Sequence, residues 1–230
     1  MKNIRTLLML LLMVSIGTAY AYQRDNRDLK GFDEISLGVS AHLHLSIGNE
    51  FKVEMEGDED DMDEIETKVE NGVLKIRHER RSGWSWNMDR VDIYVTMPEV
   101  NGLRVSGSGS IRSEDTIKSD DLELAVSGSG DLEVDIDARM VNLSISGSGD
   151  VELSGKAGEF KSTISGSGGI DAFDLVIENC DVRISGSGSV RVEVTGSLDA
   201  RISGSGSVYY EGDPENVNSS TSGSGRVRKR

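Results

Sequence analysis

Two tryptophans close together are the residues best suited to contact a ligand directly. Trp84 and Trp86 stand one residue apart in the stretch RSGWSWN. Alternate side chains of an extended segment point to the same side, so both indole rings would face one way and could stack on a sugar ring or a partner protein. A loop folded back onto the rest of the protein would contain the same pair, so the sequence leaves both interpretations open.

Metal chemistry is only weakly indicated. His42 and His44 alternate with apolar residues, which places both imidazoles on the outer face of a strand. Such a pair can bind a transition metal, but the pattern provides no third ligand, so we expect solvent-exposed histidines. The acidic stretch from Glu56 to Glu64 lacks the spacing of a calcium-binding EF-hand loop and is expected to be a solvated turn. We predict neither a metal nor another cofactor.

Serine and glycine recur in a motif, SGSG, that occurs seven times between residues 106 and 225. The first serines are separated by 21, 19, 19, 20, 18 and 19 residues, which indicates an internal repeat and not a flexible linker. In stacked repeats about 4.8 Å apart, the serines would form two outward columns that could bind a repeating ligand such as a glycan. The alternative is that serine is simply a small, soluble corner residue. The second serines, taken as candidate ligand-binding residues, are Ser108, Ser129, Ser148, Ser167, Ser187 and Ser205.

Strands must position these serines, because apolar residues alternate with polar ones on both sides of each motif. Leu122, Leu124 and Val126 precede one copy, and a second triplet from 132 to 136 follows it. Alternation with period two is typical of a half-buried strand. One repeat of about 19 residues cannot bury its apolar face alone, but stacked repeats share a core. The predicted fold class is all-β, a single-stranded β-solenoid (β-helix) with rungs of about 19 residues and a β-rich N-terminal cap.

The same alternation predicts where the glycines and the cysteine lie. If Val126 points inward, so do Gly128 and Gly130, where a side chain would collide with the interior or the backbone must bend. Cys180, the single cysteine, occupies an inward position and is expected to be a core residue. With one cysteine, no intramolecular disulfide can form.

Three segments are expected along the chain. Residues 1–21 resemble a signal peptide, with two basic residues, an apolar run and small residues before a cleavage site after Ala21. Residues 22–104 lack the motif but alternate like strands, and form the β-rich N-terminal part or cap of the coil. Residues 105–230 form the SGSG-repeat solenoid. Its basic end, Arg226 to Arg230, is interpreted as a cap that repels further strands.

The charge and hydropathy of the chain limit the classes of partner that it is expected to bind. The formal net charge of −15 argues against nucleic acid and anionic membranes, both of which repel such a protein. No second long apolar segment follows the signal peptide, so no membrane-spanning segment is expected in the mature chain. The oligomeric state is not predicted.

Several motifs together resemble a known family. GFDEISLGV near the mature start, VENGVLKI, VDIYVTMPEVNGLRVSGSG and the recurring SGSGD are similar to the putative auto-transporter adhesin, head GIN domain family, from about Gly31 to Val227. The resemblance implies a right-handed β-helical fold, export, and an origin in Bacteroidetes-type bacteria. It implies no catalytic residues. Because the repeats run to Arg230, we do not expect an auto-transporter's translocation domain in this chain, and both the periplasm and the cell surface remain possible locations.

The function expected from these features is a non-enzymatic, exported binding module of the cell envelope or surface that resembles an adhesin. A glycan or a surface protein is the candidate partner. The sequence contains no nucleophile elbow, HExxH motif or phosphate-binding loop. Outward carboxylates such as Asp131, Glu133 and Asp135 look scattered, as on a solubilising face. A β-helical carbohydrate-active enzyme and a purely structural periplasmic protein are the alternatives. A groove with clustered charged side chains would favour the enzyme.

Overall fold

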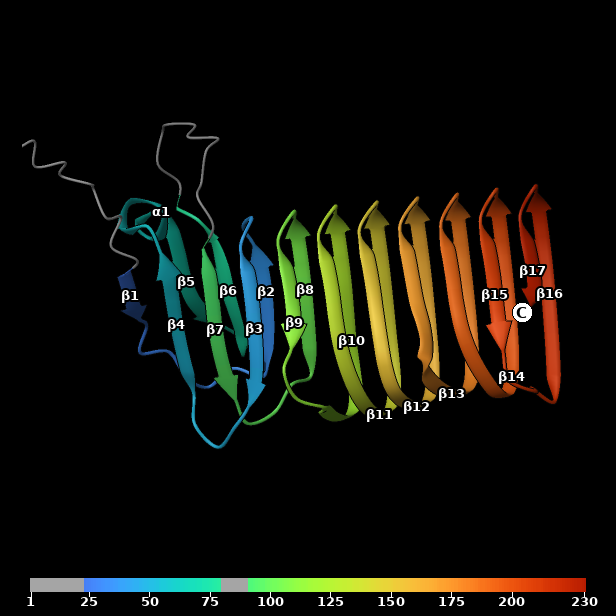
Figure 1. Cartoon of the computed structure of the whole chain (residues 1–230), viewed down its shortest axis with the longest axis horizontal. Coiled ribbons are helices and arrows are strands. Elements are labelled where there is room, and N and C mark those ends of the chain that lie inside the picture. The colour runs from blue at the N-terminus through green and yellow to red at the C-terminus, as the bar shows by residue number, and fades with distance from the viewer. Residues whose placement is uncertain (1–22, 80–90) are drawn as a thin grey trace, which may run out of the picture.

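The computed structural model describes residues 23–79 and 91–230, which form a long β-solenoid (Figure 1). The expected signal peptide, Trp84 and Trp86 lie outside the described residues. The described part contains one short helix, α1 (Glu59–Asp63), and the following strands: β1 (Gln23–Asn26), β2 (Glu34–Gly38), β3 (His42–Ile47), β4 (Lys52–Gly57), β5 (Ile65–Glu70), β6 (Val73–His78), β7 (Asp92–Met97), β8 (Gly102–Gly107), β9 (Ser110–Ser113), β10 (Ile117–Gly128), β11 (Asp131–Gly147), β12 (Asp150–Gly166), β13 (Gly169–Gly186), β14 (Ser189–Gly204), β15 (Ser207–Glu211), β16 (Asn216–Gly223) and β17 (Arg226–Lys229).

Two hydrogen-bonded ladders run along the solenoid. Ladder A contains the strands that lead into each SGSG motif and the N-terminal strands aligned with them, in the order β5, β6, β2, β8, β10, β11, β12, β13, β14 and β16. Ladder B contains those that follow it, in the order β1, β4, β7, β3, β9, β11, β12, β13, β14, β15 and β17. The long strands β11 to β14 bend at a second corner opposite the SGSG motif and so contribute to both ladders.

The apolar side chains that alternate with polar ones in the repeats form the core between the two ladders. Leu122, Leu124 and Val126 are all buried, at most 1% exposed. Each rung contains one repeat, so Val126 lies beside Ile145, 19 residues later, in the parallel pair of β10 and β11. The expected all-β solenoid with rungs of about 19 residues is therefore confirmed. Cys180 is 4% exposed, as expected of a core residue, and burial raises the pKa of its thiol.

The two glycines of each motif have different roles, which corrects the expectation that both point inward. The first, such as Gly147, turns the corner at φ 129°, a conformation that side chains rarely adopt. The second, such as Gly149, allows close approach. A Cβ there would lie 2.2 Å from the carbonyl oxygen of Gly130 and 2.5 Å from Cγ1 of Val126. Only the second glycine therefore faces the interior.

The N-terminal rungs do not stack in chain order. In ladder A, β2 lies between β6 and β8, since Ile35 is paired with both Leu74 and Leu103. In ladder B, β3 lies between β7 and β9, since Leu43 is paired with both Ile93 and Ile111. The rung formed by β2 and β3 thus lies between two rungs whose strands come later in the sequence. The same core continues through it.

Antiparallel strands and a helix close the N-terminal end. Strand β4 runs antiparallel to β7, and β5 runs antiparallel to β6, so the parallel coil stops there. Helix α1 connects β4 to β5 and begins after Asp58, whose side chain accepts a hydrogen bond from the backbone N–H of Asp60. Its Met62 covers the end of the core. The expected acidic turn is therefore a one-turn helical cap.

Candidate binding surfaces

The serines of the SGSG motifs form an ordered column at one corner of the solenoid. Their backbone registers match from rung to rung along ladder A, so each first serine lies beside the next. All of these serines are exposed. The matched first serines are Ser106, Ser127, Ser146, Ser165, Ser185, Ser203 and Ser222.

The second serines are held in place by their backbone and leave their hydroxyls toward solvent. The N–H of Ser148 donates to the carbonyl oxygen of Gly128 at 2.8 Å, and that of Ser167 donates to Gly147 at 2.8 Å. The same bond recurs at Ser129, Ser187 and Ser205. All six candidate serines are exposed. A regular row of hydroxyls, about 4.8 Å apart, is thus fixed to a rigid corner.

A groove of about 760 Å³ runs across several rungs at the opposite corner. It exists because small residues occupy this corner: a Cβ on Gly158 would lie 2.8 Å from the carbonyl oxygen of Arg139, and a Cβ on Gly196 would lie 2.7 Å from that of Glu178. Val176, 43% exposed, lies in the groove. Sequence reasoning missed this groove, although small residues recur there at Ala138, Ala157, Gly158 and Gly196.

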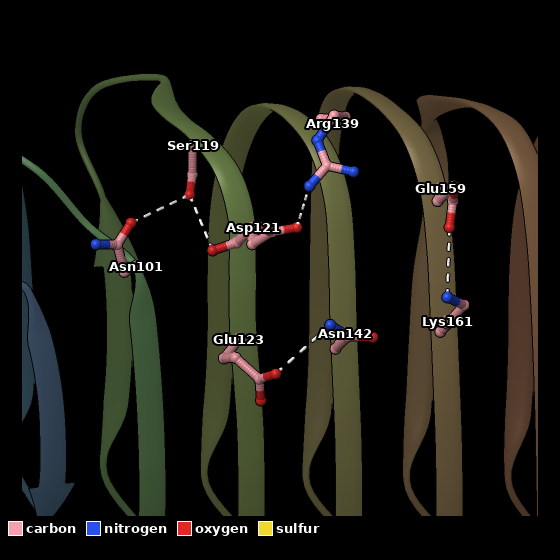
Figure 2. A network of polar contacts seen from close by, with 8 residues as sticks. All are labelled: Asn101, Ser119, Asp121, Glu123, Arg139, Asn142, Glu159 and Lys161. Carbon is pink, nitrogen blue, oxygen red and sulfur yellow. Dashed lines mark hydrogen bonds and ion pairs between the residues drawn. The ribbon is translucent and has the colours of Figure 1, made fainter.

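Charged side chains line this groove, but most of them are paired. Lys156 lies 3.1 Å from the carboxylate of Asp137, and Arg139 lies 2.6 Å from that of Asp121. Figure 2 shows the second pair reaching from one rung to the next. Two further carboxylates, Glu178 and Glu215, also line the groove. The groove can therefore hydrogen-bond and orient a polar ligand.

Polar side chains also link the rungs at the start of the ladder A strands (Figure 2). The Ser119 hydroxyl donates to the side-chain carbonyl of Asn101 at 3.4 Å, and the amide of Asn142 donates to Glu123 at 3.5 Å. Exposed pairs of this kind contribute little stability individually. Their effect here is to turn the outer face of ladder A into a mixed array of charges and amides.

A second groove, of about 520 Å³, lies on ladder B beside the serine corner. Two of the carboxylates expected to be scattered, Asp131 and Glu133, line this groove, whereas Asp135 accepts a hydrogen bond from the Ser154 hydroxyl and does not line it. Glu133 pairs with Arg112 at 3.2 Å, and Asp171 pairs with Arg191 at 2.8 Å. The acidic residues that line the groove are Asp131, Glu133, Asp150, Glu152 and Asp171. Within residues 23–79 and 91–230, no group of three or more such side chains is arranged to hold a metal ion.

The two histidines lie on the outer face of β3, as expected, but are half-buried by their partners. The Nδ1 atom of His42 is 2.8 Å from the hydroxyl of Ser110. The His44 ring stacks on Tyr94 at 5.0 Å, and its Nδ1 atom lies 3.0 Å from a carboxylate oxygen of Glu114. Each histidine therefore binds a residue on a neighbouring rung.

The family follows from a match over most of the chain. The family model described as "Putative auto-transporter adhesin, head GIN domain" matches residues 31–214. The chain belongs to this family. No protein of curated function matches the sequence. Solved structures of similar proteins are therefore expected to have the same fold as this head GIN domain protein.

Solved structures of similar proteins share the solenoid. A putative adhesin from Bacteroides fragilis NCTC 9343 has a TM-score of 0.85 at 23% identity, with 91% of this chain and 97% of that chain covered. A putative lipid binding protein from Parabacteroides distasonis ATCC 8503 has a TM-score of 0.74 at 28% identity, with 91% and 96% covered. A putative adhesin from Parabacteroides merdae ATCC 43184 has a TM-score of 0.71 at 19% identity, with 91% and 96% covered. In the described part of this chain, no helix is long and apolar enough to cross a membrane.

Proposed function

We propose that this head GIN domain protein is an exported, non-enzymatic binding module of the cell envelope or surface. Membership of an adhesin-like family supports this proposal. The observation that carries it is the column of exposed serines in matched register, fixed by backbone hydrogen bonds on a rigid solenoid. A row of hydroxyls with a regular repeat fits a ligand that also repeats, such as a glycan chain or an extended segment of a surface protein.

The mechanism proposed is multivalent contact without chemistry. Each hydroxyl can donate one hydrogen bond and accept others, so a single rung contributes little affinity. Several rungs together contribute more because the solenoid has already fixed the serines, and little conformational entropy is lost on binding. Trp84 and Trp86, if they lie beside this row, would add stacking to sugar rings.

The test is a binding screen with the chain from residue 22, the expected mature start. The panel should contain bacterial and host glycans, and also phospholipid vesicles, because one similar solved structure is a putative lipid binding protein. The variant replaces the six second serines with Ala. A matched control replaces Ser144 and Ser220, exposed serines of ladder A outside the corner, with Ala.

Loss of binding in the corner variant alone, with an unchanged circular dichroism spectrum, would support the serine row. Equal binding by all three proteins would refute it. Export is tested separately, by protease accessibility on intact and permeabilised cells. Digestion on intact cells would support surface display, whereas protection until permeabilisation would contradict the adhesin role and support a periplasmic protein.

The groove at the second corner favours one alternative, a β-helical carbohydrate-active enzyme. It is the feature that such an enzyme needs, and Glu178 and Glu215 are the carboxylates in it that could act as acid and base. The experiment is incubation with polysaccharides, using Glu178→Gln and Glu215→Gln as variants. Release of shorter sugars that either variant abolishes would establish the enzyme and overturn the binding-only role.

A further inference from the structure

The C-terminal end of the described solenoid is open, because Arg226–Lys229 form strand β17 and not the cap expected from the sequence. Among the described strands, β16 pairs only with β14, and β17 pairs only with β15. All eight residues of β16 are exposed, and Val217 is 41% exposed although its neighbour Leu198 in β14 is 1% exposed. One edge of each ladder and the end of the core therefore face outward together (Figure 1). Unpaired strand edges of this kind are ready to pair with another chain.

Four basic side chains lie at this open end, beside the three acidic residues Glu211, Asp213 and Glu215 that precede β16. Residues 216–230 contain four basic residues and no acidic one, Arg226, Arg228, Lys229 and Arg230. Lys229 is paired with Asp213, and Arg230 lies 3.5 Å from Glu211. Arg226 and Arg228 have no ion pair among the described residues. Two such ends would repel each other, since each brings cations to the same place.

The N-terminal end carries the opposite charge. Residues 56–64 contain seven acidic residues and no basic one, Glu56, Asp58, Glu59, Asp60, Asp61, Asp63 and Glu64. Glu59, Asp60 and Asp63 are exposed on α1, which crosses from ladder B to ladder A at this end. Among the described strands, β1 and β5 are the outermost here, one on each ladder. Each ladder therefore presents an edge strand at both ends of the solenoid (Figure 1).

We propose that the basic C-terminal end of one copy docks on the acidic N-terminal end of a second copy. Strand β16 would lie antiparallel beside the partner's β5, because β5 runs opposite to the rest of ladder A. The contact is heterologous, so it repeats and builds a filament of stacked solenoids. Eight residues of strand span about 26 Å, and two sheets about 10 Å apart form an end about 20 Å wide once their outer side chains are included, so the contact buries roughly 1,000 Å² in total. That area lies at the low end for specific interfaces, so the association is weak and reversible.

The test uses two blocked variants of the chain from residue 22, followed by sedimentation velocity. Arg226→Glu with Arg228→Glu blocks the C-terminal end. Glu59→Lys with Asp60→Lys and Asp63→Lys changes all three exposed carboxylates of α1 and blocks the N-terminal end. The matched control for the C-terminal variant, Arg183→Glu with Arg201→Glu, makes the same charge change in the middle of the solenoid. All positions are exposed, so the fold should persist, which circular dichroism verifies.

The wild type and the control should form oligomers that grow with concentration and dissociate at least about tenfold more readily in 0.5 M than in 0.02 M salt, because salt screens the complementary charges. Each blocked variant alone should stay monomeric. Their mixture should form dimers and nothing larger, since one free C-terminal end then meets one free N-terminal end. A wild type that stays monomeric at every concentration would overturn the proposal. Self-association of a blocked variant, or a mixture without dimers, would also overturn it.

Discussion

Substituting alanine at two corner glycines separates the strain of the turn from the stacking of the rungs. Gly107 and Gly147 occupy the same place in their motifs, at φ 108° and 129°. A Cβ on Gly107 meets nothing within 4 Å, whereas one on Gly147 would lie 2.3 Å from the carbonyl oxygen of Gly128. Both substitutions introduce the same backbone strain, but only the second introduces a collision.

The magnitudes follow from these contacts. An alanine held at such a φ costs about 1 to 3 kcal/mol, offset by about 0.4 to 1 kcal/mol from the stiffer unfolded chain. At Gly147 the neighbouring rung must also move by about 1 Å. The oxygen that must move accepts the hydrogen bond from the N–H of Ser148 at 2.8 Å. Overpacking and a weakened hydrogen bond add about 3 kcal/mol. We expect Gly107→Ala to lower the free energy of unfolding by about 1 to 2 kcal/mol and Gly147→Ala by about 4 to 5 kcal/mol.

Urea unfolding of both variants, followed by circular dichroism, measures the difference. Limited proteolysis should accompany it, because a solenoid can open locally at the altered rung. Cleavage near residue 147 in the Gly147 variant would locate the damage. Equal destabilisation by the two substitutions would show that the turn alone requires glycine and would refute the role of rung-to-rung contact.

Three further predictions concern single side chains. Ser162→Val should raise the free energy of unfolding by about 1 kcal/mol in urea melts. The buried Ser162 hydroxyl has no hydrogen-bond partner among the described residues, and the residues at the same position of the neighbouring rungs are apolar. A loss of stability would contradict this prediction. Cys180 should react with a thiol reagent at pH 8 only as fast as the protein unfolds, since burial raises the pKa of its thiol; rapid labelling of folded protein would disprove it. Hydrogen bonds from Lys68 and then from Lys75 lower the pKa of Glu70 to about 2. The stabilising contribution of the Glu70 carboxylate is therefore present above pH 4.5 and is lost as the pH falls toward 2. An NMR titration that finds a midpoint near 4.5 would show that this pairing is absent in solution.

The repeats were predictable because their physics is local. Alternation placed Leu124 and Val126 inside, and the constant spacing of the motif required each rung to lie beside the next. The outward row of serines followed from the same two facts. The direction of Gly128 did not follow, because alternation assumes extended backbone and the first glycine of each motif turns at positive φ, 115° in this copy.

Neither the groove nor the stacking order of the N-terminal rungs could be predicted from the sequence, and the reasons differ. The groove arises where small residues such as Gly158 and Gly196 stack across rungs, and the second corner has no fixed motif that marks this alignment. The place of the first rung depends on pairing over long sequence separations. Ile35 meets Leu103, 68 residues away, and no periodicity in residues 22–104 encodes that distance. The role of Trp84 and Trp86 stays a prediction.

The enclosed first rung has a consequence for the order of folding. Within the repeats each new rung needs only its predecessor, about 19 residues earlier, so folding can propagate by short loop closures. Strands β2 and β3 instead need partners on both sides, some of which come about 68 residues later. Loops of that length close more slowly, since contacts distant in sequence slow folding.

The two halves of the solenoid should therefore acquire structure at different rates. The repeats can wind early, whereas β2 and β3 have partners on one side only, β6 and β7, until β8 and β9 pair with them on the other side. In pulsed hydrogen exchange during refolding, amides of β11 to β13 should gain protection before those of β2 and β3. The segment synthesised first would then be among the last to become native, which makes it the part most dependent on chaperones.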